Sequence, residues 1–349
     1  MKIADDKKIN LDFQEKLPLW MTENHVPTVG VAVIEKGKLK LAKVFGELQK
    51  DTIAPKDTLF DVCSLTKPIA AMTVLRLVSA GKWDLDEPLF HYWIDNDVKD
   101  DIRLKKLTTR FVLSHQTGFP NWRWDTPSKK LSFSFEPGTK YQYSGEGFVY
   151  MKRAIEKKLG NSWKDITNDL LFTPLRMKKT RLVWDSSLDR SLLAVPHNEN
   201  GDPLKPEFEQ KLDLTPHLAT TLDDIEYHYS PAGSLVTTVE EYAKFAINVL
   251  NGAGLSKNIY KEMSTSQRKV FGSLSAGLGW FIINNLSKDQ YAIVHTGDDP
   301  GLRTVVVLLP QSKCGVVVLT NGDNGNKIYK NVIKESLSVG GELVKTVGF

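Results

Sequence analysis

Short apolar segments rich in β-branched residues lie near both ends of the chain. Near the amino end, residues 27–46 contain VGVAVIE and KLKLAKVFG on either side of Lys36 and Gly37, a pattern typical of a β-hairpin. Toward the carboxyl end, apolar runs separated by polar and turn residues predict three or four further strands, at 279–284, 291–295, 302–309 and 315–320. Helical spacing over 327–337 predicts a helix packed on this sheet.

The middle of the chain has helical periodicity instead, over residues 65–80, 149–159, 163–171 and 239–250. We therefore expect an α/β (α+β) fold whose antiparallel sheet is assembled from both chain ends, with flanking helices and a mostly helical inserted lobe. The expected sheet lobe comprises residues 1–62 and 255–349, and the helical lobe residues 63–254. A functional cleft is expected at their junction, lined by the long polar and aromatic loops 117–137 and 196–231.

Composition narrows the function classes. Of the 349 residues, 41% are hydrophobic and 25% are charged, which is typical of a globular protein. The net charge of +4 without a basic run argues against nucleic-acid binding. Cys63 and Cys314 are too few for a disulfide framework, and the seven histidines include no H-E-x-x-H pair, so a catalytic metal is not expected.

The amino-terminal residues are charged, and no apolar run is long enough for a signal segment or a membrane span. Two alternatives stay open for the compartment: a cytoplasmic protein, or an exported protein whose signal is absent from this sequence. The oligomeric state is not predicted.

Ser64 and Lys67 are the first candidates for chemistry. Ser64 lies at the start of a predicted helix, and Lys67 follows three residues later on the same face. A nearby amine with a pKa lowered by desolvation can accept the proton of a serine hydroxyl, and a helix amino terminus favours negative charge there. The same spacing recurs at 79–82 and 266–269, but the first closes the helix and the second lies in a polar stretch. The structural alternative is an N-cap serine with a solvated lysine.

Two further motifs follow along the chain. Tyr143 comes after a Pro-Gly turn and just before a predicted helix, so its phenol can reach the cleft; the alternative is a packed tyrosine. His295, Thr296 and Gly297 end a predicted strand, and the glycine marks a place where the backbone approaches another group closely.

In order, spacing and context, these three motifs resemble the penicillin-recognising serine hydrolases: class C β-lactamases, D-alanyl-D-alanine peptidases of that branch and related serine esterases. The segments 111–120, 136–144 and 230–245 also resemble that family. The similarity extends roughly from Val26 to Thr320 and implies a β-lactamase-like fold. It implies chemistry that needs no cofactor.

The resemblance also implies roles. Ser64 would be the nucleophile that accepts the acyl group, and Lys67 and Tyr143 would share the acid and base work. The backbone N–H groups of Ser64 and Asp298 would form the oxyanion hole. His115, in LSHQTG, is expected to be a structural loop residue.

Two positions depart from the family pattern. Gly145 stands where the motif Tyr-x-Asn has an amide that holds a substrate's acylamino group, and His295 stands where a lysine often anchors a substrate carboxylate. An imidazole with an ordinary pKa near 6.5 is mostly neutral at pH 7, so the carboxylate contact must weaken or move. Arg303 on the next strand could replace it or could point to solvent.

The remaining candidates lie beside these motifs. Trp122 and Trp124 flank Arg123 in a long loop, where they could form an aromatic rim to the substrate pocket or pack in the core. Cys63, next to the nucleophile, is expected to be a buried thiol without catalytic function.

The sequence therefore predicts a serine hydrolase that acts through an acyl-enzyme on Ser64, with an ester or a small amide or peptide as substrate. Candidate substrate-binding residues are His295, Thr296, Gly297, Arg303, Gly145 and Trp122. The alternatives are a β-lactamase or D-alanyl-D-alanine carboxypeptidase that takes a peptide or lactam, and a non-catalytic sensor module of the same fold.

Overall fold

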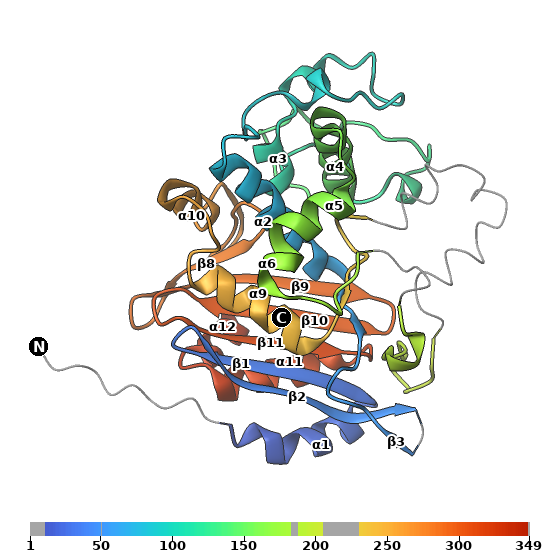
Figure 1. Ribbon diagram of the computed structural model, residues 1–349, viewed down its shortest axis with the longest axis vertical. Coiled ribbons are helices and arrows are strands. Elements are labelled where there is room, and N and C mark those ends of the chain that lie inside the picture. The colour runs from blue at the N-terminus through green and yellow to red at the C-terminus, as the bar shows by residue number, and fades with distance from the viewer. Residues whose placement is uncertain (1–10, 50, 183–187, 205–229, 348–349) are drawn as a thin grey trace, which may run out of the picture.

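A computed structural model describes residues 11–49, 51–182, 188–204 and 230–347. Its centre is a nine-stranded sheet in the order β3-β2-β1-β11-β10-β9-β8-β7-β6, with every neighbouring pair antiparallel (Figure 1). The first and last thirds of the chain meet where β1 (Thr28–Glu35) pairs with β11 (Cys314–Thr320), with Val31 opposite Val318. The expected assembly of one sheet from both chain ends is confirmed.

The amino-terminal hairpin is also confirmed. β1 turns into β2 (Lys38–Gln49) through Lys36 and Gly37, whose φ angles are 51° and 72°. Two successive positive φ angles are those of the tight turn that matches the twist of paired strands. The other strands of the sheet are β3 (Thr52–Ile53), β6 (Arg268–Phe271), β7 (Leu274–Ala276), β8 (Phe281–Leu286), β9 (Gln290–Asp299) and β10 (Leu302–Leu309). A separate pair is formed by β4 (Phe60–Asp61) and β5 (Val236–Thr237).

Helices cover both faces of the sheet. On one face lie α1 (Phe13–Glu23), α11 (Gly325–Ser336) and α12 (Gly340–Val347), which share an apolar core with Val29, Val31 and Val33. On the other face α9 (Val239–Leu250) packs against β1, β2 and β11, where Ala32 and Ile34 join a second core. The expected helical lobe includes the residues of α9, but this helix covers the sheet.

The helical lobe lies above the sheet in Figure 1. Its helices are α2 (Thr66–Ser79), α3 (Thr109–Leu113), α4 (Gly145–Leu159), α5 (Trp163–Thr167), a π-helix (Asn168–Phe172) and α6 (Thr173–Leu175); α10 (Lys257–Met263) lies beside α2. Single 3₁₀ turns lie at Cys63–Leu65, Leu89–His91, Ile102–Lys106, Arg123–Asp125 and Arg190–Leu192. Most of the expected loop 196–231 lies outside the described residues. Within the described ranges, no helix is both long and apolar enough to cross a membrane.

Candidate active site

Ser64 lies in a tight turn between β4 and α2, where the helical lobe meets the sheet. Its neighbour Cys63 is fully buried and has a φ of 49°, a left-handed conformation that is strained for a side chain of this kind. Asp61 Oδ1 accepts from the Cys63 N–H at 2.9 Å, and Thr304 Oγ1 on β10 donates to the Val62 carbonyl at 3.0 Å. These bonds hold the turn from both sides and fix the position of Ser64.

Lys67 faces Ser64 across one helical turn. Its Nζ donates to Ser64 Oγ at 3.0 Å and to the Ala232 carbonyl at 2.8 Å, and the lysine is only 1% exposed. Ser64 makes no side-chain cap bond to α2, so the N-cap alternative is wrong. The Ala232 carbonyl had no sequence signal of its own, because any residue carries the same backbone group.

Tyr143 completes this cluster from the loop before α4. Its ring centroid lies 4.6 Å from Lys67 Nζ, and the nearby side chain of Ser64 acts to lower the pKa of its phenol. Burial raises the pKa of the Tyr143 phenol far above its ordinary value of 10, so the hydroxyl keeps its proton at neutral pH. The structure thus brings together the three residues that the sequence predicted as catalytic.

His115 supports Tyr143. Among the described residues, no hydrogen bond joins His115 to the Ser64 hydroxyl. Its ring stacks on Tyr143 with centroids 4.3 Å apart, and its Nδ1 accepts from the Ser144 N–H at 3.2 Å. Burial, together with the charge of Lys67, lowers the pKa of His115 well below 6.5. A neutral ring can accept at Nδ1, so this imidazole orients the Tyr143 loop, in keeping with the structural role expected for it.

Gly297 allows β9 to lie directly against the Ser64 turn. A Cβ at this position would be 2.4 Å from the Val62 carbonyl oxygen and 2.3 Å from Thr304 Oγ1, which no side chain tolerates. The pairing of β9 with β8 ends at Val294, opposite Phe281, so residues 295–299 are paired with β10 alone. The free edge of β9 therefore includes Asp298, whose N–H is the predicted second donor of the oxyanion hole.

His295 is buried among aromatic rings and is 2% exposed. Its Nδ1 lies 2.8 Å from the Thr296 carbonyl, and its ring centroid lies 5.4 Å from that of Phe281. Burial and the nearby charge of Lys67 lower the pKa of His295 to about 3. The imidazole is consequently neutral at every physiological pH, more strongly so than an ordinary histidine.

Arg303 does not lie beside Ser64. The adjacent Thr304 faces the Ser64 turn, so strand alternation places Arg303 on the opposite face of the sheet, where it pairs with Asp298 and Asp323 at 3.0 Å each. This position argues against Arg303 as an anchor for a substrate carboxylate. The guanidinium does not point freely to solvent either, because it pairs with the carboxylates of Asp298 and Asp323. Thr296 shares that face and lines the same pocket, of about 260 Å³.

Gly145 leaves room for an indole. A Cβ on Gly145 would lie 2.5 Å from Trp122 Cη2, so the ring of Trp122 occupies the space that a side chain at 145 would take. Trp122 stacks on Trp124 with ring centroids 4.7 Å apart and planes within 10° of parallel. Both residues are partly exposed, and Trp122 also packs against the main apolar core, so the two rings lie at the edge of that core.

Comparisons with known proteins agree with this architecture. A β-lactamase family profile matches residues 13–337. "Penicillin-binding protein 4" of Amycolatopsis lactamdurans is 25% identical over 93% of this chain and 88% of its own length. "Protein flp" of Staphylococcus aureus strain MW2 is 20% identical over 86% of this chain, which spans 61% of that relative.

Solved structures share the fold. The octameric penicillin-binding protein homologue from Pyrococcus abyssi superposes with a TM-score of 0.73 and 21% identity over 96% of this chain and 77% of its own. The D-amino acid amidase from Ochrobactrum anthropi SV3 superposes with a TM-score of 0.70 and 20% identity over 91% and 98% of the two chains. Because the family profile spans nearly all of the sheet and the helical lobe, this chain belongs to the β-lactamase family and is a serine hydrolase.

Proposed function

We propose that the protein hydrolyses esters or small neutral amides through an acyl-enzyme on Ser64. The observation that carries the proposal is the hydrogen bond of 3.0 Å between Lys67 Nζ and Ser64 Oγ, made by a lysine that is almost fully buried. A hydroxyl paired with a desolvated amine is the arrangement that activates a serine at neutral pH. Tyr143, whose ring lies 4.6 Å from Lys67 Nζ, supplies a second proton carrier.

In the proposed reaction, the Ser64 oxygen attacks the substrate carbonyl while its proton passes to Lys67, which must first have lost one of its own protons to act as the base. The oxyanion accepts hydrogen bonds from the N–H groups of Ser64 and Asp298, each of which contributes about 3 to 4 kcal/mol to the transition state. The bond to the leaving group then breaks, and this group takes the proton that Lys67 received from Ser64, relayed through Tyr143. Water attacks the resulting ester, returns a proton to Ser64 and releases the acid.

The charges around Ser64 favour substrates without a carboxylate. His295 is neutral, and Arg303 is bound by Asp298 and Asp323 on the other face of the sheet. A substrate carboxylate would therefore gain little from either side chain. The likeness to a D-amino acid amidase supports amides as a second substrate class beside esters.

The test is a fluorophosphonate probe combined with a substrate panel. We expect one adduct on Ser64, no adduct in Ser64→Ala, and faster turnover of p-nitrophenyl acetate than of nitrocefin. Faster turnover of nitrocefin would favour a β-lactamase, and release of D-alanine from a D-alanyl-D-alanine peptide would favour a carboxypeptidase. Labelling of Ser64 without turnover of any of these substrates would favour a sensor module.

A further inference from the structure

The loop that carries Trp122 is fastened to the start of α4. Asn121 Oδ1 accepts from the Gly145 N–H at 3.0 Å, and the Asn121 carbonyl accepts from the Glu146 N–H at 3.0 Å. Tyr143 lies two residues before Gly145 in the chain. The loop therefore adjoins the segment that positions the phenol at Ser64.

Trp122 and Trp124 together form an aromatic surface next to this segment, which we call the tryptophan pair. The edge of Trp122 covers Gly145 so closely that no other residue fits there with the ring in place. The two parallel indoles are partly exposed. A flat, partly exposed aromatic surface binds flat apolar groups well, because such groups bury area and stack on the ring at the same time.

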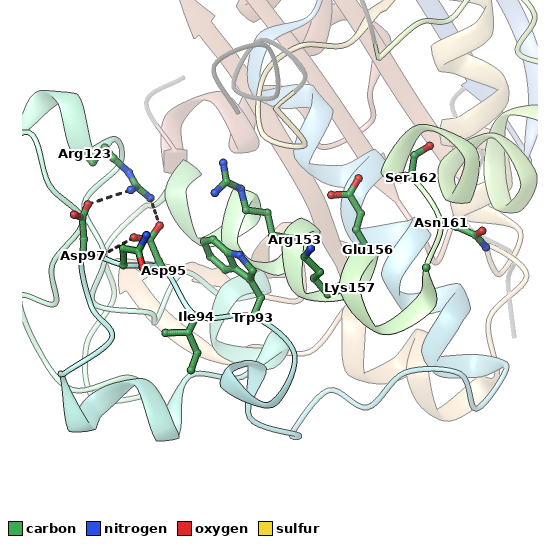
Figure 2. Close-up of a pocket in the computed structure, with 12 residues that line it drawn as sticks. Trp93, Ile94, Asp95, Asp97, Arg123, Arg153, Glu156, Lys157, Asn161 and Ser162 are labelled. Carbon is green, nitrogen blue, oxygen red and sulfur yellow. Dashed lines mark hydrogen bonds and ion pairs between the residues drawn. The ribbon is translucent and has the colours of Figure 1, made fainter. Parts of the chain in front are cut away.

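Arg123, which lies between the two tryptophans in sequence, binds a cluster of three carboxylates. Its guanidinium lies 2.9 Å from Glu146 Oε2, 2.8 Å from Asp95 Oδ2 and 3.2 Å from Asp97 Oδ2. Glu146 also accepts from the Arg123 backbone N–H at 2.9 Å. Figure 2 shows Arg123 reaching Asp95 and Asp97 at one end of a pocket of about 850 Å³.

This cluster fixes the loop because Glu146, its central acid, is inaccessible to water and is paired with Arg123 of the loop. The Glu146 side chain is fully buried and that of Asp95 is 6% exposed, so both depend on Arg123 for a cation. The planar guanidinium satisfies several carboxylates in fixed directions, which a lysine cannot reproduce. Glu146 directly follows Gly145, the residue that Trp122 covers. By binding Glu146, Arg123 therefore ties the loop that carries both indoles to the start of α4.

We propose that Arg123 is a positioning residue for substrate recognition: it holds the tryptophan pair over Gly145, and the pair binds a flat apolar group of the substrate. This inference rests on the proposed hydrolysis at Ser64. It assigns the arginine no contact with the substrate and no part in proton transfer.

The test compares substrates that differ in one flat group. The pairs are p-nitrophenyl phenylacetate against p-nitrophenyl acetate, and benzyl acetate against ethyl acetate. In the wild type we expect kcat/KM to favour the aromatic member of at least one pair by about 10-fold or more, the range that apolar pocket contacts give. Trp122→Ala and Arg123→Lys should each remove most of that preference by raising KM for the aromatic ester more than KM for the other member of the pair. Trp122→Phe should retain the preference.

A second half-buried arginine supplies the matched control. Arg110 also pairs with two carboxylates, Asp86 and Glu262, and its side chain is 21% exposed against 19% for Arg123. Arg110→Lys should leave the ester preference unchanged. If Arg123→Lys does not fold, Asp97→Asn removes one partner from the more exposed side of the cluster and should reduce the preference in part.

The outcomes separate this inference from the proposed function. A wild type that is labelled at Ser64 but prefers neither aromatic ester overturns the inference alone. The inference is also overturned if Arg123→Lys slows turnover of both members of a pair equally. It is overturned as well if Trp122→Ala removes the preference while Arg123→Lys and Asp97→Asn leave it unchanged. A wild type that the fluorophosphonate does not label refutes the proposed function, and the inference with it.

Discussion

Replacing Gly297 with alanine tests the contact between β9 and the Ser64 turn. The new Cβ would lie 2.4 Å from the Val62 carbonyl oxygen and 3.1 Å from Cys63 Cβ. Restoring an ordinary contact of about 3.4 Å requires the strand and the turn to separate by about 1 Å, because both neighbours are held by other bonds and cannot rotate away. A displacement of that size in a catalytic site costs about 100-fold in rate.

The assay measures kcat and KM for p-nitrophenyl acetate, the rate of fluorophosphonate labelling and the free energy of unfolding in urea. We expect Gly297→Ala to lower both kcat and the labelling rate by about 100-fold, with a loss of about 1 to 3 kcal/mol in stability from overpacking. Gly341→Ala is the control, since its Cβ would meet nothing within 4 Å. If the rates for Gly297→Ala are within threefold of the wild type, Gly297 does not set the distance between Ser64 and the free edge of β9, where the second donor of the oxyanion hole is predicted.

Three further predictions concern charge and proton transfer. Lys67→Ala and Tyr143→Phe should each lower kcat by about 10² to 10⁴-fold, the usual contribution of positioned proton transfer, while leaving the urea unfolding curve cooperative. Near-normal turnover in Tyr143→Phe would show that the phenol only packs beside Lys67 and transfers no proton. Because the pKa of His295 is about 3, the ratio of nitrocefin turnover to p-nitrophenyl acetate turnover should stay flat from pH 5 to 8. His295→Lys should raise this ratio at pH 7.5. An inflection of the ratio near pH 6.5 that His295→Gln abolishes would contradict this prediction. The free energy of unfolding should fall as pH drops below 6.5, because unfolded His295 binds a proton that the folded ring refuses down to about pH 3. His295 alone contributes a slope of about 1.4 kcal/mol per pH unit, and buried His115 adds to the slope in the same direction. His295→Gln should therefore lessen the slope, and an unchanged slope would argue against this reasoning.

The long strands and amphipathic helices could be predicted because their patterns repeat over many residues. The helix expected at 239–250 is α9 with the same bounds, and the hairpin of Lys36 and Gly37 is present. Three short strands of the nine-stranded sheet were missed: β3, β6 and β7 span only two to four residues each, which is too short for an alternation to show. Helix α1 was also missed, although Phe13, Leu17 and Met21 recur at helical spacing, because Pro18 interrupts its pattern.

The site was predictable where chemistry depends on side-chain type and spacing. Ser64 and Lys67 meet because three residues on a helix span almost one turn. The orientation of Arg303 was not predictable, since alternation along β10 gives its face only after one residue of the strand is placed, as the bond from Thr304 to the Val62 carbonyl does here. The depth of the pKa shift at His295 also needed the packing of Phe281 and Lys67 around the ring.

The two departures from the family pattern change the cleft in the same direction. At position 145 a polar side chain is missing and the indole of Trp122 takes its space, and at position 295 a neutral imidazole stands where a cation is common. Each change alone removes one polar contact with a substrate, but together they leave apolar surface on the α4 side and no permanent charge from residue 295 on the β9 side. A buried carboxylate without a partner is costly, whereas an aryl or alkyl group gains from the same surroundings. The proposed preference for neutral substrates with an apolar group thus follows from both changes, and a carboxylated lactam would gain from neither.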